Sequence, residues 1–209
     1  MPIIDLTRDF IGERFPAEIR REEKHLKSAG TEYTGVVYTV THDGMCGTYI
    51  DFPGHIAETA DGIGADRCPL ESVYRVPASV IHLDFRSGDG AVSAADLEAA
   101  AGGKPHTEAL IVNALAAPLE PDEIAMRSVY LDDGAVDWII ASGCRLLVSD
   151  VFESRALHGV FPKLFAAGIK TVCMPVNLHR ITVPEVLLTA LFVKMPGVTQ
   201  LPCRLVAEV

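Results

Sequence analysis

The second half of the chain alternates apolar, β-branched stretches with segments of helical spacing, and this alternation constrains the fold more than any other feature of the sequence. The stretches expected as strands are Ala109–Leu115, Arg145–Asp150 and Ile169–Val176. The segments expected as helices are Asp132–Ser142 and Arg155–Ala167. Each helical segment is followed by a glycine, a frequent helix stop. Such alternation predicts an α/β fold with parallel strand pairs.

The first half is richer in strand signals. Valines and a tyrosine predict a strand over Tyr33–Thr41, and Ser93 is a plausible N-cap for a short helix over Ala94–Ala101. Further strands are expected at Pro2–Leu6, Val76–Phe85, Glu185–Val193 and Leu201–Val206. The charge-dense segment Arg14–Lys27 predicts an exposed arm or helix, within residues 14–30. Without linkers or repeats, residues 1–209 are expected to form a single domain.

Charge and cysteine usage narrow the function classes. The formal net charge of −10 argues against a nucleic-acid binder, which needs a basic face. The longest apolar run is too short to span a membrane. Five cysteines without a CxxC pair indicate a reducing compartment, and no signal peptide is visible at the N-terminus. We therefore expect a cytoplasmic protein that binds neither nucleic acid nor a membrane.

The segment Met45–His55 carries the chemistry. Asp51 and His55 stand four residues apart, and Pro53 and Gly54 between them interrupt regular structure. A carboxylate beside an imidazole suits acid–base chemistry or metal binding. The simpler alternative, in which Asp51 caps a turn and His55 is an ordinary imidazole, stays open from spacing alone.

This segment resembles the signature of the cyclase family, which includes bacterial kynurenine formamidase and isatin hydrolase. The family pattern is His-x-Gly-Thr-His-x-Asp-x-Pro-x-His. The residues that match it in register are Gly47, Thr48, Asp51, Pro53 and His55. The resemblance implies an α/β, swivelling β/β/α-type single domain that forms a homo-oligomer. It also implies hydrolysis of a small amide or lactone, as in the arylformamidase reaction.

The sequence departs from the family at the metal ligands. Met45 and Tyr49 replace the first two histidines of the pattern. By the resemblance, Asp51 matches the bridging metal carboxylate and His55 the proton shuttle. The two later ligand positions fall on Phe161 and Cys173. Because Phe161 cannot bind a metal and a thioether suits Zn²⁺ or Mn²⁺ poorly, a family-type two-metal centre is not expected.

Three hypotheses therefore remain. One divalent metal, Zn or Mn, binds Asp51, His55 and Cys173. Alternatively no metal is needed: His55 acts as general base, Asp51 orients it, and Tyr49 donates a hydrogen bond to the oxyanion. In the third hypothesis catalysis is lost, and the protein binds a small molecule or serves in assembly.

One pair outside the motif is a candidate for substrate binding. His179 and Arg180 follow the strand that carries Cys173. Arg180 could bind a substrate carboxylate through two parallel hydrogen bonds. An exposed turn is the alternative for the same pair.

Overall fold

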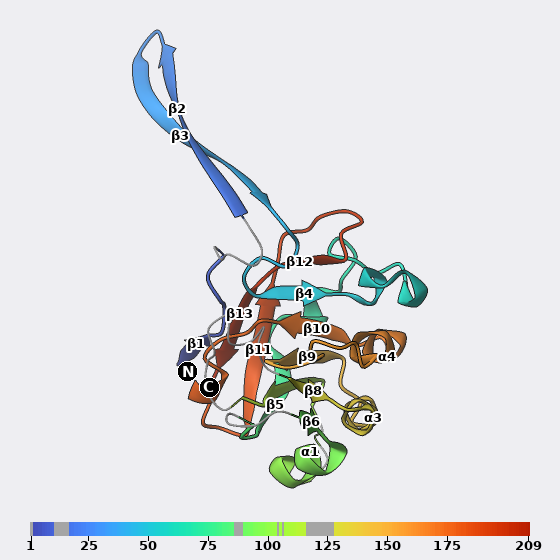
Figure 1. Ribbon diagram of the computed structural model, residues 1–209. Helices are drawn as coiled ribbons and strands as arrows, with labels where there is room; N and C mark the ends of the chain where they lie inside the picture. The colour runs from blue at the N-terminus through green and yellow to red at the C-terminus, as the bar shows by residue number, and fades with distance from the viewer. Residues whose placement is uncertain (1, 11–16, 86–89, 104, 106, 116–127) are drawn as a thin grey trace.

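A mixed β-sheet of nine strands forms the body of the molecule in the computed structural model, which describes residues 2–10, 17–85, 90–103, 105, 107–115 and 128–209 (Figure 1). In spatial order the strands are β1 (Ile3–Asp5), β13 (Arg204–Glu208), β11 (Glu185–Leu191), β5 (Val76–His82), β7 (Ala109–Asn113), β9 (Leu146–Ser149), β10 (Lys170–Cys173), β4 (Tyr49–Asp51) and β12 (Gln200–Pro202). The central strands β5, β7, β9 and β10 run parallel, and the pairings outside them are antiparallel.

Three helices cover one face of this sheet, and Figure 1 shows them on the same side of it. They are α1 (Ala94–Ala101), α3 (Asp133–Ala141) and α4 (Val160–Ala166). Alternate residues of β7 separate two buried clusters, since Leu110 and Val112 pack with the helices whereas Ile111 packs on the other side. Burial on both faces is typical of parallel strands. A second, small parallel sheet is formed by β6 (Gly90–Val92) and β8 (Val129–Leu131).

The predicted α/β class is confirmed, together with two helix starts. The Ser93 hydroxyl accepts from the amide of Asp96 at 3.3 Å, and the Asp96 carboxylate accepts from the amide of Ser93 at 2.8 Å. This reciprocal capping box fixes the start of α1. Asp132 caps α3 by accepting from the amide of Ala135 at 2.7 Å. In the part of the chain that the structure describes, no helix is long and apolar enough to cross a bilayer.

The helix expected over Arg155–Ala167 begins only at Val160. The Glu153 carboxylate accepts from the backbone amides of His158 and Val160, and so holds residues 153–159 in a loop. Gly159 enters α4 with a positive φ of 80°, which a helix does not use. Residues 155–159 were therefore wrongly predicted as helical.

The closing strand expected over Leu201–Val206 is two strands. The residues up to Pro202 pair with β4 at one edge of the sheet, and those from Arg204 pair with β11 towards the other. Cys203 lies at the crossing, where its amide donates to the carbonyl of Thr48 at 2.9 Å. One continuous strand cannot pair with both β4 and β11, because other strands lie between these two in the sheet.

A long hairpin leaves the body and projects into solvent (Figure 1). Its strands are β2 (Ala17–Ser28) and β3 (Thr31–His42), each of twelve residues. The charge-dense segment expected as an arm or helix over Arg14–Lys27 is thus a strand from Ala17 on, and its residues 14–16 lie outside the described residues. The strand expected over Tyr33–Thr41 is its partner. Hereafter the arm means residues 17–42.

Gly47 and Thr48 have structural roles beside the site. Gly47 has a φ of +63°, and a Cβ there would lie 3.0 Å from the carbonyl oxygen of Arg8. The Thr48 hydroxyl accepts from the amide of Arg8 at 2.8 Å and donates to the carbonyl of Met174 at 2.9 Å. The pair therefore ties the segment after β1 to the end of β10.

Replacing Gly47 with alanine should lower the free energy of unfolding by about 2 kcal/mol, because an L-residue in the left-handed region costs roughly 1–2 kcal/mol before the contact with Arg8 is added. Gly30→Ala is the matched control, since a Cβ at Gly30 would have no neighbour within 4 Å. Urea unfolding of both variants measures the difference. Equal stabilities would contradict the structural role of Gly47.

Candidate functional site

The candidate site lies on one face of three neighbouring strands, β10, β4 and β12. Asp51 is opposite Thr171 on one side and Gln200 on the other. Because side chains alternate along a strand, these three residues share a face. Tyr49 is on the same face, opposite Cys173 and Pro202.

The opposite face of the same strands belongs to the hydrophobic core. Ile50, Val172 and Leu201 are paired across the three strands, and all are buried in one apolar cluster. A slip of one residue in the pairing would bring Asp51 into that cluster. The core therefore fixes which way the polar face points.

Asp51 is a buried carboxyl group, with only 2% of its surface exposed. Its Oδ2 accepts a hydrogen bond from the Cys173 thiol at 3.6 Å. Its Oδ1 is buried and has no hydrogen bond of ordinary geometry within the described residues. Burial raises the pKa of Asp51 from 3.8 to about 6, although the Gln200 amide, the His55 imidazole and the Cys173 thiol favour the charged form.

The cysteines beside Asp51 are held as neutral thiols. Burial, and then the nearby Asp51 charge, raises the pKa of Cys173 well above its usual value of 9.0. The same two causes raise the pKa of Cys203 to about 12. A thiol is a poor nucleophile and a poor metal ligand until it loses its proton. Cys173 therefore acts here as a hydrogen-bond donor to Asp51.

His55 lies at the end of a single 3₁₀ turn, η1 (Pro53–His55), directly after β4. Its Nε2 lies 3.1 Å from Nε2 of Gln200. With the Gln200 amide nitrogen as the donor, Nε2 of His55 accepts in this contact. A ring nitrogen in the acceptor role is the kind of group that can take a proton as a general base.

Gln200 is the site residue that the sequence did not reveal. It stands 145 positions after His55 and belongs to no motif. The pairing of β12 with β4 places it opposite Asp51, where its amide is also close enough to favour the charged carboxylate. Only the spatial position of β12 beside β4 links the three residues.

The remaining sequence-predicted residues separate into two groups. Tyr49 is half-buried on the polar face, and its side chain hydrogen-bonds the Cys173 thiol. His179 and Arg180 are exposed on the turn η4 (Leu178–Arg180). Leu178 on that turn is buried in the core cluster that contains Ile50, on the face opposite Asp51. The structure therefore does not bring His179 and Arg180 to the Asp51 face.

The donor set does not fit the metal centre of the family. Phe161, at an expected ligand position, lies on α4 with its ring 5.0 Å from that of Phe152 and 5.7 Å from that of Phe165. Met45 offers only a thioether. Among the residues that the structure describes, no group of three or more His, Cys, Asp or Glu side chains could hold a metal ion. The set of Asp51, His55 and Cys173 expected from the sequence is not assembled as ligands.

The raised pKa of Asp51 predicts a specific pH dependence of stability. The folded carboxyl group keeps its proton up to about pH 6, whereas the unfolded one loses it near pH 3.8. The free energy of unfolding should therefore fall as pH rises across this interval, by roughly 3 kcal/mol, and stay level above it.

Asp51→Asn should remove this fall, because the amide keeps an acceptor for Cys173 and cannot ionise. Urea unfolding of both proteins between pH 4 and pH 7 measures the difference, since the other carboxyl groups are common to both. Parallel curves for the two proteins would show that Asp51 titrates normally.

Comparison with known proteins identifies the family and the fold. The family model described as "Putative cyclase" matches residues 4–154, which is well over half of the chain. No curated protein sequence matches the chain significantly.

Solved structures match the fold over nearly the full chain. Isatin hydrolase A from Labrenzia aggregata, bound to benzyl benzoate, has a TM-score of 0.77 at 17% identity, covering 99% of this chain and 93% of that chain. Isatin hydrolase A from Ralstonia solanacearum has a TM-score of 0.70 at 15% identity, covering 99% and 91%. A protein from Bacillus stearothermophilus described as a predicted metal-dependent hydrolase has a TM-score of 0.65 at 16% identity, covering 99% and 97%.

These identities establish a shared fold, and the family model adds a match in sequence. The motif residues Asp51 and His55 lie within the matched range, on the polar face of β4 and directly after it. The chain belongs to the cyclase family and has the fold of its metal-dependent hydrolases.

Proposed function

We propose that the chain is a hydrolase of a small amide or lactone, with an arylformamidase-like reaction and a centre that has lost the family's metal ligands. Membership of the cyclase family and the hydrolase neighbours support the reaction class. The isatin hydrolases, named for a cyclic amide, support a compact aromatic amide or lactone as substrate. Five free cysteines support a cytoplasmic location for this activity.

The observation that carries the proposal is the buried Asp51 carboxyl beside the His55 imidazole. A carboxyl group with a pKa of about 6 can change its charge near neutral pH, and an imidazole lies beside it. Gln200 links them, since its amide donates to His55 and faces Asp51. An imidazole that accepts a proton, next to a carboxylate that stabilises the resulting imidazolium, suits carbonyl hydrolysis.

The proposed reaction uses only side chains of this face. A water molecule takes the place of the Gln200 amide as the hydrogen-bond donor to Nε2 of His55. The water oxygen attacks the carbonyl carbon of the substrate while Nε2 accepts a proton from the water. The ionised Asp51 stabilises the imidazolium that results. The tetrahedral intermediate then breaks its C–N or C–O bond, and His55 returns the proton to the leaving nitrogen or oxygen. Tyr49 is the hydrogen-bond donor proposed for the oxyanion.

The altered donor set supports a second candidate, a non-catalytic family member that binds a small molecule. Met45, Tyr49 and Phe161 together remove three expected ligand positions. In this case a small molecule binds at the Asp51 face and is not hydrolysed. Measuring binding and hydrolysis on the same compounds distinguishes the two candidates.

The first test compares hydrolysis of an N-formyl aromatic amine, a cyclic aromatic amide and an aromatic lactone, each with and without a chelator. Hydrolysis by the wild type should persist with the chelator. His55→Ala should lower kcat/KM about 100-fold or more, since a general base contributes roughly that much.

His42→Ala is the matched control for this test. His42 is exposed, and its Nδ1 contacts the carbonyl of Asp43 at 2.8 Å, at the end of the arm strand. The control should keep full activity. Unchanged turnover in His55→Ala would reject the proposed base, and binding without turnover in the wild type would favour the second candidate.

The pH profile provides a separate test. With Asp51 required in its charged form, kcat/KM should rise with pH through a midpoint of about 6 and level off above it. The Asp51→Asn variant should be impaired at every pH and should lose this midpoint. A wild-type profile that is flat between pH 5 and pH 7 would contradict a role for ionised Asp51.

A further inference from the structure

The Gln200 carboxamide lies across the polar face that carries Asp51. Its Nε2 is 3.1 Å from Nε2 of His55, and its amide is also close enough to the Asp51 carboxyl group to favour the charged form. The rest of the side chain lies over Gly44, where a Cβ would be 3.0 Å from Oε1 and 3.3 Å from Cγ of Gln200. A primary amide therefore stands between the two titratable groups of the site.

The Gln200 side chain can leave this position without disturbing the core. Strand β12 is the last strand at its edge of the sheet (Figure 1), and Gln200 is only partly buried. His55, to which its amide donates, is exposed. The next residue, Leu201, points the opposite way and holds β12 in the hydrophobic core. A ligand that arrives from solvent beside His55 therefore meets a side chain that it can replace.

Oδ1 of Asp51 is a buried acceptor with no hydrogen bond of ordinary geometry within the described residues. The carboxyl group is 2% exposed, and its other oxygen, Oδ2, accepts from the Cys173 thiol at 3.6 Å. Buried polar atoms are nearly always hydrogen-bonded, and a catalytic role is one of the recurring reasons for an exception. The nearby Gln200 amide does not complete the bond, so Oδ1 is an acceptor for which a ligand can supply the donor.

Both groups that Gln200 separates act as acceptors. Nε2 of His55 accepts from the Gln200 amide, and Oδ1 of the ionised Asp51 can only accept. The Cys173 thiol directs its proton to Oδ2, and Tyr49 hydrogen-bonds that thiol. A ligand that takes the place of Gln200 is therefore selected for an N–H group. An amide nitrogen that carries a hydrogen supplies one, whereas the ring oxygen of a lactone only accepts.

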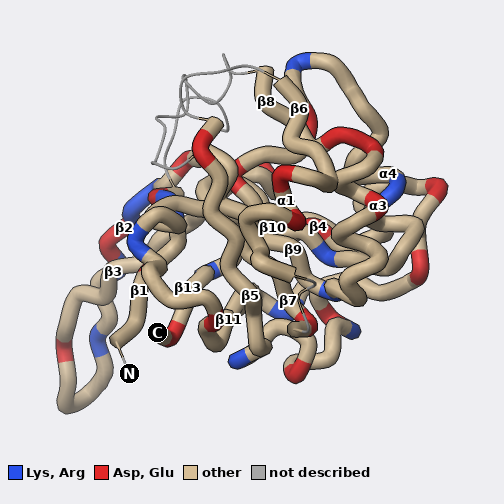
Figure 2. The backbone as a smooth tube through the Cα atoms, turned by 90° about the horizontal axis from the view of Figure 1, so that it is seen from below, with Lys and Arg blue, Asp and Glu red and all other residues tan. Residues whose placement is uncertain are grey.

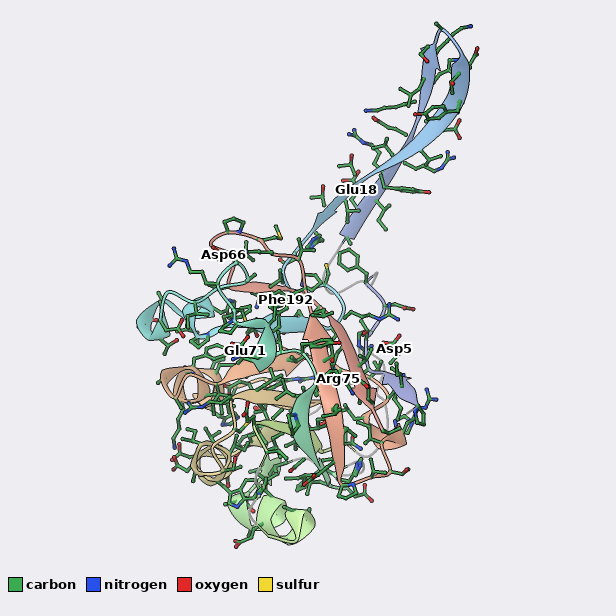
Figure 3. All side chains as sticks on the ribbon, turned by 180° about the vertical axis from the view of Figure 1, so that it is seen from behind. Asp5, Glu18, Asp66, Glu71, Arg75 and Phe192 are labelled. Atoms are coloured by element: carbon green, nitrogen blue, oxygen red, sulfur yellow. The ribbon has the colours of Figure 1, made fainter. Side chains whose placement is uncertain are left out.

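The arm does not supply the donor for Oδ1. Away from its base it extends from the body, with its side chains directed into solvent (Figure 3). Charged residues of both signs follow one another along it (Figure 2). Several of them pair within the arm, since Arg21 lies 2.6 Å from Glu23 and Lys27 lies 2.9 Å from Glu32. The donor is therefore expected from a bound molecule.

We propose that the Gln200 carboxamide holds the place of the substrate's amide group, and that Oδ1 of Asp51 accepts a hydrogen bond from the substrate N–H once Gln200 is displaced. This inference rests on the proposed function and narrows its substrate class to amides that carry an N–H group, with lactones as weak ligands. The attacking water takes over the bond to His55, and the substrate takes over the position that faces Asp51. Asp51 thereby holds the leaving nitrogen beside the imidazole that returns the proton to it.

The test measures binding separately from turnover, at pH 8 and in a His55→Ala background that lacks the proposed base. Isothermal titration calorimetry compares an aromatic cyclic amide with the lactone of the same ring size, in which oxygen replaces the N–H. The amide should bind about tenfold more tightly or better, since a hydrogen bond to a charged group contributes at least that much. Adding Asp51→Asn should remove this preference, because an amide nitrogen at the position of Oδ1 donates rather than accepts.

Two further variants are compared in the same background. Asp137→Asn also removes one carboxylate, but on α3, where the side chain is 62% exposed, and it should keep the preference. Gln200→Ala removes the side chain that the ligand displaces, so the amide should bind at least as tightly as before, with the preference intact. Weaker amide binding in Gln200→Ala would show that Gln200 holds the ligand and does not stand in for it.

Three results would each overturn the N–H contact: equal affinities for the amide and the lactone, a preference that survives Asp51→Asn, or an equal loss of preference in Asp137→Asn. These results differ from failure of the proposed function, which is an absence of hydrolysis by the wild type for every compound tested. A wild type that hydrolyses these compounds while its His55→Ala variant binds the amide and the lactone equally would keep the proposed function and reject the contact.

Discussion

Strand β4 is three residues long, and the candidate site depends on both of its edges being paired. Hydrogen bonding to β10 and β12 fixes the register in which Asp51 stands between Thr171 and Gln200. The same register sends Ile50 into the core, where its burial opposes any slip. The position of one carboxyl group is thus set by the packing of the apolar residue beside it. Without β12, Asp51 would lack the amide that links it to His55.

The residues of the motif divide into structural and chemical parts. Gly47 and Thr48 hold the backbone against Arg8 and the end of β10. Asp51 and His55 are titratable residues in register with the family pattern, whereas Met45 and Tyr49 stand where that pattern has histidines. The site that results has a buried carboxyl group whose pKa is set by burial rather than by a metal. Under the proposed function, this buried carboxyl group and the imidazole beside it supply acid–base chemistry without the family's metal ligands.

Signals that act within a few residues predicted most helices and strands. Features that depend on contacts between distant parts of the chain were not predicted. Ser93 could be recognised as a helix cap because a cap acts within three residues. The start of α4 was predicted too early because the Glu153 carboxylate accepts hydrogen bonds from backbone amides of the expected first turn. The arm was ambiguous because its charged strand has no hydrophobic period of its own.

The site was only half visible in the sequence for the same reason. Asp51 and His55 lie four residues apart, whereas Gln200 joins them through a strand pairing that no spacing records. His179 and Arg180 follow Cys173 closely in sequence, but the chain turns onto the other face of the sheet before reaching them. Because they are close to Cys173 in sequence, His179 and Arg180 were expected in the same substrate site, but the turn directs them away from the Asp51 face.

The central claim is that Asp51 is a buried carboxyl group that ionises close to neutral pH. Its most direct test is a carbon-13 NMR titration of protein labelled at the aspartate carboxyl carbons, with Asp51→Asn used to assign the resonance. The resonance missing from the variant should titrate in the wild type with a midpoint of about 6. A midpoint near 3.8 would show that burial does not control this carboxyl group, and the account of the site would fail.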